Sequence, residues 1–119
     1  MIIRKIGYML AAIATSATFY QCSTFKVATP TNEEVSVAQK HWPDANIQSM
    51  NAGYTILTTK CEKCHGPKNI TKFSENDLKK VLDKMAVKAK LSDQEKESVT
   101  RYILAEREYR IAQKAANKK

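Results

Sequence analysis

Residues 61–66 read Cys-Glu-Lys-Cys-His-Gly, and they contain two of the three cysteines and one of the two histidines in the chain. A zinc ribbon is disfavoured, because it needs a second pair of ligands and no Cys or His follows His65. A thioredoxin-like redox pair is also disfavoured, since no strand-like alternation precedes Cys61. A structural disulfide between Cys61 and Cys64 would leave the adjacent histidine unexplained.

The order Cys-x-x-Cys-His is the attachment motif of a c-type haem. In that chemistry each cysteine thiol adds to a vinyl group of the porphyrin, and the histidine ligates the iron from the proximal side. The motif therefore predicts one haem c with a single iron, bound covalently through Cys61 and Cys64. His65 is the expected proximal ligand.

The length and composition of the chain favour a single all-α domain. With 119 residues, a multi-domain enzyme with separate cofactor and substrate lobes is excluded. Three glycines and three prolines argue against a turn-rich all-β fold. Aromatic residues make up 8% of the sequence, so few large side chains are available for a core, and a haem would supplement it.

Helical periodicity predicts a helix over about residues 45–59, which leads directly into Cys61. Gly53 lies on the apolar side of this helix. A glycine inside a helix costs about 1 kcal/mol relative to alanine, so we expect a packing reason for it. The apolar positions that recur at helical spacing are Ile47, Met50, Tyr54 and Leu57.

Two further helices are expected after the loop that contains Gly66 and Pro67. Each begins with a serine that is followed three residues later by an acid, which is the pattern of a capping box. The boxes are Ser74 with Asp77 and Ser92 with Glu95. The expected inward-facing residues of the two helices are Leu78, Val81, Leu82, Met85, Ala89, Val99, Tyr102, Ile103 and Tyr109.

This order of helix, CxxCHG, loop, helix and terminal helix resembles the class I cytochrome c family, and in particular the small exported single-haem cytochromes of bacteria. The resemblance covers about residues 41–105. It rests on Trp42, Pro43, Gly53, Cys61 to Gly66, Met85, Leu91, Ser92, Glu95, Tyr102, Ile103 and Leu104. It implies an all-α fold of three main helices wrapped around one haem, with electron transfer rather than enzymatic catalysis as the activity.

The resemblance also implies a close helix crossing. In that family a glycine of the first helix lets the terminal helix approach closely, and Gly53 with Tyr102 are the candidates for this contact. One departure is Leu78, where many relatives have a tryptophan, and it puts the packing over the haem edge in question.

The sixth iron ligand is sought among the few soft or nitrogen donors left in the folded part. Met50 belongs to the apolar stripe of the first helix, so core packing explains it. His41 precedes that helix and is expected to be exposed. Met85 lies on the apolar face of the second helix, and its position matches the distal methionine implied by the resemblance. A lysine ligand or an open sixth position remains as the alternative.

The first 21 residues predict an export signal of the lipoprotein type. Arg4 and Lys5 are followed by an uncharged run over residues 6–20, which is shorter than the roughly 20 residues of a spanning helix. Cys22 directly after the signal is a candidate for lipidation. Cleavage after Ala17 with soluble secretion, or a retained anchor, are the competing interpretations.

Three segments are expected after the signal. Residues 22–40 are polar and lack periodicity, which predicts a flexible tether. Residues 41–114 are expected to form the haem domain. Residues 115–119 are expected to form a basic tail.

Together these features predict a one-electron carrier. We expect it in the periplasm or cell envelope, anchored to the membrane and either monomeric or part of a complex. The chain has a formal net charge of +8, and residues 60–90 hold nine lysines against four acids, which could steer an acidic redox partner. Export disfavours nucleic acid as a partner. The alternatives are a gas-binding or sensor module with an open sixth site, and an electron-transfer subunit of a larger oxidoreductase. The nine lysines are Lys60, Lys63, Lys68, Lys72, Lys79, Lys80, Lys84, Lys88 and Lys90.

Overall fold

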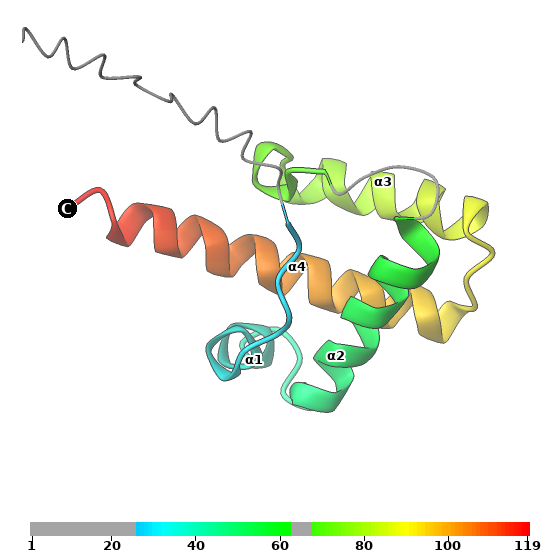
Figure 1. Ribbon diagram of the computed structural model, residues 1–119, viewed down its shortest axis with the longest axis horizontal. Helices are drawn as coiled ribbons and strands as arrows, with labels where there is room; N and C mark the ends of the chain where they lie inside the picture. Colours follow the sequence, from blue (N-terminus) through cyan, green and yellow to red (C-terminus); the bar gives the residue numbers. More distant parts are fainter. Residues whose placement is uncertain (1–25, 63–67) are drawn as a thin grey trace, which may run out of the picture.

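Residues 26–62 and 68–119 are described by a computed structural model, and every regular element in them is helical (Figure 1). The prediction of an all-α chain is confirmed for this part. None of its helices is long and apolar enough to span a bilayer. The α-helices are α1 (Asn32–Gln39), α2 (Ile47–Ile56), α3 (Glu75–Lys88) and α4 (Asp93–Ala116), joined by a π-helical turn η1 (Leu57–Cys61) and a 3₁₀ turn η2 (Ile70–Lys72).

Several expectations fall on residues that lie outside the described ones. The export signal over residues 1–21 and the lipidation candidate Cys22 precede the first described residue. Cys64 and His65 of the haem motif lie in the undescribed segment 63–67. These four expectations therefore stay predictions.

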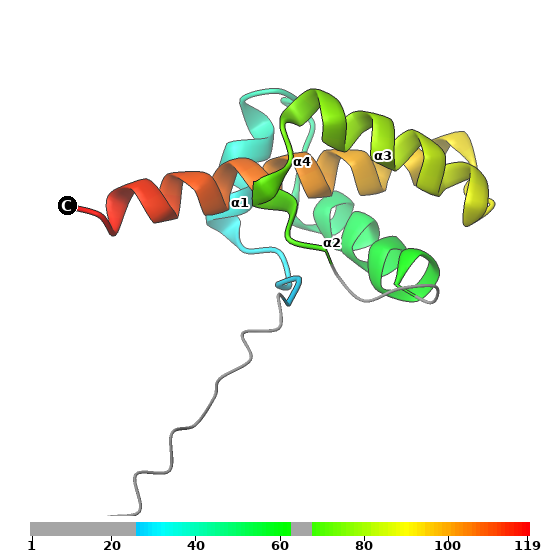
Figure 2. The same cartoon turned by 90° about the horizontal axis from the view of Figure 1, so that it is seen from above.

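The long helix α4 runs through the middle of the fold, with α1, α2 and α3 packed along its N-terminal two thirds (Figures 1 and 2). Its last turns project beyond the other helices. Burial follows this arrangement, because α4 supplies more core side chains than any other element. The buried apolar residues of α4 are Val99, Tyr102, Ile103, Leu104 and Ala105.

Local sequence signals set the starts of α3 and α4 as expected. Ser74 accepts a hydrogen bond from the backbone N–H of Asp77 at 3.1 Å, and Ser92 and Glu95 form a complete capping box. The helix predicted over residues 45–59 is also present, as α2 followed without a break by η1. At the C-terminus, α4 continues to Ala116, so the first two residues of the expected tail are helical.

The turn between α3 and α4 is formed by a left-handed residue. Lys90 has a φ of 54° and is the only non-glycine residue with positive φ in the described part of the chain. The N–H of Lys90 donates to Val87 O at 3.2 Å, and the N–H of Leu91 donates to Ala86 O at 3.0 Å. These are the two hydrogen bonds of a Schellman motif, which ends α3 and turns the chain back along α4.

The segment expected to be a tether is a helix at its C-terminal end, which corrects the prediction for residues 32–39. Thr31 and Glu34 form a capping box that begins α1. Val35 and Ala38, one turn apart, are 8% and 0% exposed and pack into the core with α4. Two apolar residues are too few to produce visible periodicity, but they are enough for an eight-residue helix that is supported by tertiary contacts.

Residues 26–31 are held against α4 as well. The hydroxyl of Tyr102 donates to the carbonyl oxygen of Ala28 at 2.6 Å, and Arg110 Nη2 donates to the carbonyl oxygen of Lys26 at 2.8 Å. Pro30 is buried. The folded part of the described chain therefore includes residues 26–40, rather than beginning at residue 41.

Candidate functional site

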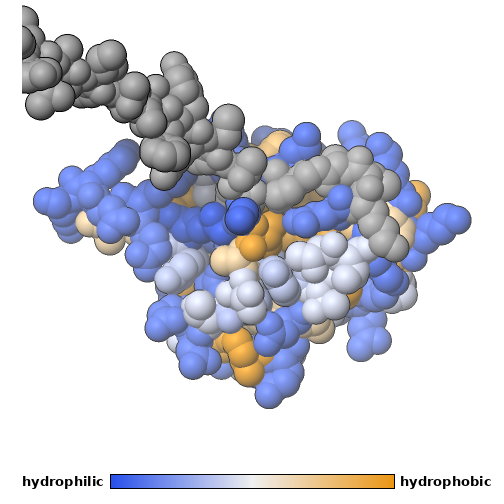
Figure 3. Space-filling view, in the orientation of Figure 1, coloured by the Kyte–Doolittle hydropathy of each residue, from blue (hydrophilic) through white to orange (hydrophobic). Residues whose placement is uncertain are grey.

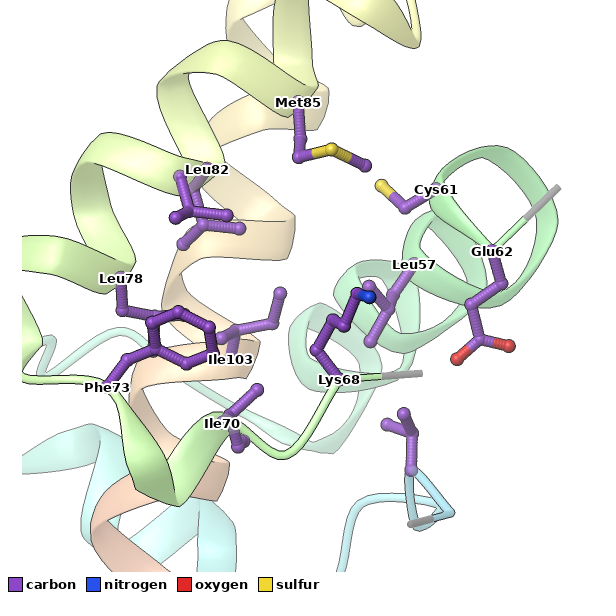
Figure 4. Close-up of a pocket in the computed structure, with 12 residues that line it drawn as sticks. Leu57, Cys61, Glu62, Lys68, Ile70, Phe73, Leu78, Leu82, Met85 and Ile103 are labelled. Atoms are coloured by element: carbon purple, nitrogen blue, oxygen red, sulfur yellow. The ribbon is translucent and has the colours of Figure 1, made fainter. Parts of the chain in front are cut away.

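An apolar pocket opens between η1, α3 and α4, and it contains two residues that the sequence assigns to a haem (Figure 4). The empty space of the pocket, with its open mouth included, has a volume of about 590 Å³. Figure 3 shows the same region from outside, as hydrophobic surface between α2 and α3 with hydrophilic side chains around it. The lining residues are Val27, Leu57, Cys61, Glu62, Lys68, Ile70, Phe73, Leu78, Val81, Leu82, Met85 and Ile103.

The π-helical turn η1 presents Cys61 to the pocket. The backbone N–H of Glu62 donates to Leu57 O at 3.0 Å, five residues back, which is the hydrogen bond of a π-helix. Thr58 and Thr59 contribute to this geometry, because their hydroxyls donate to carbonyl oxygens of the preceding turn at 3.0 and 2.6 Å. The widened turn places the side chain of Cys61 in the pocket lining, where the residue is 4% exposed.

The environment of Cys61 keeps its sulfur protonated. Burial raises the pKa of the thiol, and the negative charge of the neighbouring Glu62 raises it further. At neutral pH the side chain is therefore a thiol rather than a thiolate. It is a free cysteine in the described part of the chain.

Met85 enters the same pocket from the opposite side, on α3. Its thioether points toward the sulfur of Cys61 across the pocket (Figure 4). Leu82 and Leu78, one and two turns earlier on α3, are buried, whereas Val81 is 37% exposed although it lines the pocket. The α3 residues that line the pocket therefore range from buried, as Leu78 and Leu82 are, to partly exposed, as Val81 is.

The other donors considered from the sequence lie elsewhere. Met50 is 1% exposed and belongs to the core cluster, so its predicted packing role is confirmed. His41 is exposed, as predicted, and its Nε2 lies 2.7 Å from the carboxylate of Glu108. Neither residue lines the pocket that contains Cys61 and Met85.

Three lining residues were not identified from the sequence: Val27, Ile70 and Phe73. Val27 lies in the segment assigned to a tether, and the other two lie in the loop after the haem motif, as does Lys68, which was expected only as one of the cations around the site. The only local signal was an isolated apolar residue in a polar stretch. Ile70 and Phe73 also have helical spacing, which fits the 3₁₀ turn at η2.

No group of three or more His, Cys, Asp or Glu side chains suited to a metal ion occurs in the part of the chain that the structure describes. The same part brings Cys61 and Met85 together at one pocket. It places Met50 and His41 outside that pocket.

The lysine-rich region around the pocket is partly compensated by acids. Lys60 forms an ion pair with Glu95, and Lys79 forms one with Glu75 at 2.6 Å. Both pairs are at the surface, where ion pairs contribute little to stability. Lys84 and Lys88 are exposed on α3.

Comparisons with known proteins return no similarity to this chain. No protein-family model matches it, and neither a curated protein nor a solved structure matches it significantly. The functional argument therefore depends on the chemistry of the motif and of the pocket.

Proposed function

We propose that this protein is a one-electron carrier that uses a single c-type haem, attached through Cys61 and Cys64 and ligated by His65 and Met85. The observation that carries the proposal is the position of Cys61 and Met85 at opposite sides of one apolar pocket (Figure 4). These residues are 24 positions apart in the sequence and lie on different elements. Both are residues that the haem hypothesis requires at such a site.

The character of the pocket supports this assignment. Its lining is almost entirely apolar, with Glu62 and Lys68 as the only ionisable residues besides Cys61 among those that the structure describes. A haem has two apolar faces and a polar edge, so aliphatic side chains such as Leu57 and Leu82 would cover the faces and keep water out. The empty space of about 590 Å³ includes the open mouth, so a haem would occupy that mouth as well.

Each residue of the site would have a separate task. Cys61 would supply a protonated thiol that could add to a vinyl group of the porphyrin. Met85 supplies a thioether, which favours the reduced state of an iron that it ligates and raises the reduction potential. The bound haem would supply one-electron chemistry. Lys68, the cation of the lining, would balance negative charge at the pocket mouth.

The surroundings are consistent with a carrier that meets a protein partner. The excess of lysines over acids in residues 60–90 would attract an acidic redox protein and make the encounter sensitive to salt. The expected export signal would place the protein in the periplasm or cell envelope, where c-type haem is attached.

The test is the optical spectrum of exported protein, oxidised and reduced, with and without carbon monoxide. We expect haem absorbance that persists through denaturing electrophoresis, because the haem is covalently attached, and slow or absent carbon monoxide binding at neutral pH. The Cys61→Ala, Cys64→Ala double variant should lose the covalent haem. Protein without haem after export through a haem-attaching host would overturn the proposal. Rapid stoichiometric carbon monoxide binding would instead favour the gas-binding alternative.

A further inference from the structure

The surface beside the C-terminal half of α4 is formed by three chain segments that are rich in cations. They are residues 26–31, residues 68–73 and residues 106–119. Hydrogen bonds join the three segments directly. Arg107 Nε donates to Phe73 O at 2.9 Å, Lys114 Nζ donates to Thr71 Oγ1 at 3.0 Å, and Arg110 reaches the carbonyl oxygen of Lys26 at 2.8 Å.

The exposed charge of this surface is strongly positive. The three segments contain only two acids, Glu106 and Glu108. Glu106 is 1% exposed and forms an ion pair with Arg110, and Glu108 pairs with His41 and Lys40. The remaining cations, apart from Lys68, which lines the pocket, form what we call the basic face. Its members are Lys26, Lys72, Arg107, Lys114, Lys118 and Lys119.

Helix geometry gives the basic face an amphipathic character. Arg107, Ile111 and Lys114 are spaced by four and three residues, so they lie on one side of α4. Ile111 is 39% exposed, one of three large hydrophobic residues that the described part of the chain leaves exposed. Cations around an exposed aliphatic side chain are typical of helices that lie on a lipid surface.

The sequence before residue 26 indicates which partner the basic face would meet. The apolar run of residues 6–20 and the lipidation candidate Cys22 come shortly before Lys26, whose carbonyl is fixed on Arg110. Four extended residues span at most about 14 Å from Cys22 to Lys26, and six span about 20 Å from Tyr20. A membrane that held either anchor would therefore lie within about 20 Å of Lys26, which is about two Debye lengths at 0.1 M salt.

We infer that the basic face docks on an anionic lipid surface and orients the domain on the membrane that its N-terminal segment enters. The N-terminal anchor would hold the domain near the bilayer, and the basic face would add an electrostatic attraction that favours anionic lipid and sets the orientation. The inference depends on the N-terminal anchor and not on haem, so its failure would leave the proposed function unaffected.

The experiment measures how the full chain partitions between vesicles of pure phosphatidylcholine and vesicles that also contain phosphatidylglycerol. The N-terminal anchor contributes to both partition coefficients, so their ratio isolates the electrostatic part. The test variant is Lys114→Gln, Lys118→Gln. The matched control is Lys84→Gln, Lys88→Gln, which removes the same charge at the same spacing from the exposed side of α3.

A Lys near an anionic surface contributes about fivefold to binding, so the test variant should lower the ratio about 25-fold. The control should lower it by less than about threefold, and added salt should remove the preference of the unmodified chain for anionic vesicles. The inference is overturned if both variants lower the ratio equally, or if the unmodified chain shows no preference for anionic lipid.

Discussion

A methyl group added to Gly53 would lie 2.6 Å from the Cβ of Tyr102, so α2 and α4 cross with no space for a side chain at this position. The same methyl group would be 2.3 Å from the carbonyl oxygen of Ser98. The close approach lets the ring of Tyr54 meet the ring of Tyr102 edge to face, with 5.8 Å between their centroids. The contact proposed for Gly53 and Tyr102 from the sequence is thus confirmed.

Replacing Gly53 by alanine should destabilise the fold. Alanine favours a helix by about 1 kcal/mol over glycine, but both atoms that it would meet are on or next to the α4 backbone and cannot rotate away. We expect a net loss of at least about 2 kcal/mol in the free energy of unfolding, measured by urea denaturation. Ala52→Ser, at an exposed position of the same helix, is the control and should change stability by less than about 0.5 kcal/mol. An equal effect of both substitutions would contradict the tight crossing.

Replacing Met85 by leucine should alter the haem without disturbing the fold. The two side chains have similar volumes, so the cost in stability should stay below about 1.5 kcal/mol. Loss of the thioether should lower the reduction potential and allow rapid carbon monoxide binding to the reduced protein. The control is Met50→Leu, since Met50 is buried in the core and does not line the pocket. If Met85→Leu and Met50→Leu bind carbon monoxide alike, Met85 is not the ligand.

Removing the hydroxyl of Tyr102 should loosen the segment before α1. Tyr102→Phe loses the 2.6 Å hydrogen bond to the carbonyl oxygen of Ala28, which contributes about 1 kcal/mol. Hydrogen exchange at the backbone amides of residues 26–29 should become faster. Tyr109→Phe is the matched control on α4, because the described residues offer its hydroxyl no hydrogen bond. Unchanged exchange in Tyr102→Phe would show that this bond does not hold the segment.

Tyr102 should also make stability fall at alkaline pH. Burial raises the pKa of its hydroxyl above the ordinary value near 10, so the folded state resists deprotonation. The resulting stability is fully present below pH 10 and is lost as the pH rises above it. Urea denaturation between pH 9 and pH 11 should show a steeper decline for the unmodified protein than for Tyr102→Phe. Parallel pH profiles for the two proteins would argue against this cause.

The ion pair between Asp44 and Arg101 should contribute stability at neutral pH and lose it in acid. The hydrogen bond from Arg101 Nη1, 3.0 Å long, lowers the pKa of the Asp44 carboxyl below its ordinary value. A lowered pKa stabilises the folded state above the unfolded pKa of about 4, and the contribution disappears as the pH falls through the folded value. Asp44→Asn should therefore be slightly less stable at pH 7, and the difference should shrink below pH 4. A difference that stays constant down to pH 2 would count against the ion pair.

Local signals in the sequence were sufficient for three of the four α-helices. The caps at Ser74 and Ser92 depend on residues three positions apart, and the stripe of α2 depends on residues within the same helix, so no distant contact was needed to recognise them. The helix α1 was missed for the opposite reason. Its two apolar residues, Val35 and Ala38, form no periodic pattern, and they stabilise the helix only through the core contacts that they make in the folded protein.

The residues of the candidate site also fall into those that the sequence identified and those that it did not. Cys61 was identified from residue type and spacing, Met85 from elimination together with the family resemblance, and the structure brings both to one pocket. Val27 and Phe73 were not identified, because neither belongs to a periodic segment. Their role depends on the path of chain segments that lie far from Cys61 in sequence.

The positions of α2, α3 and α4 could be read from the sequence, because capping and periodicity are local properties. The place of residues 26–31 could not, since they join the folded part and reach the pocket through Val27 only by contacts with distant residues. The hydrogen bonds that hold this segment join Tyr102 to Ala28 and Arg110 to Lys26, across 74 and 84 positions. Such contacts form only once α1 packs on α4 and places the segment before α1 beside Tyr102 and Arg110.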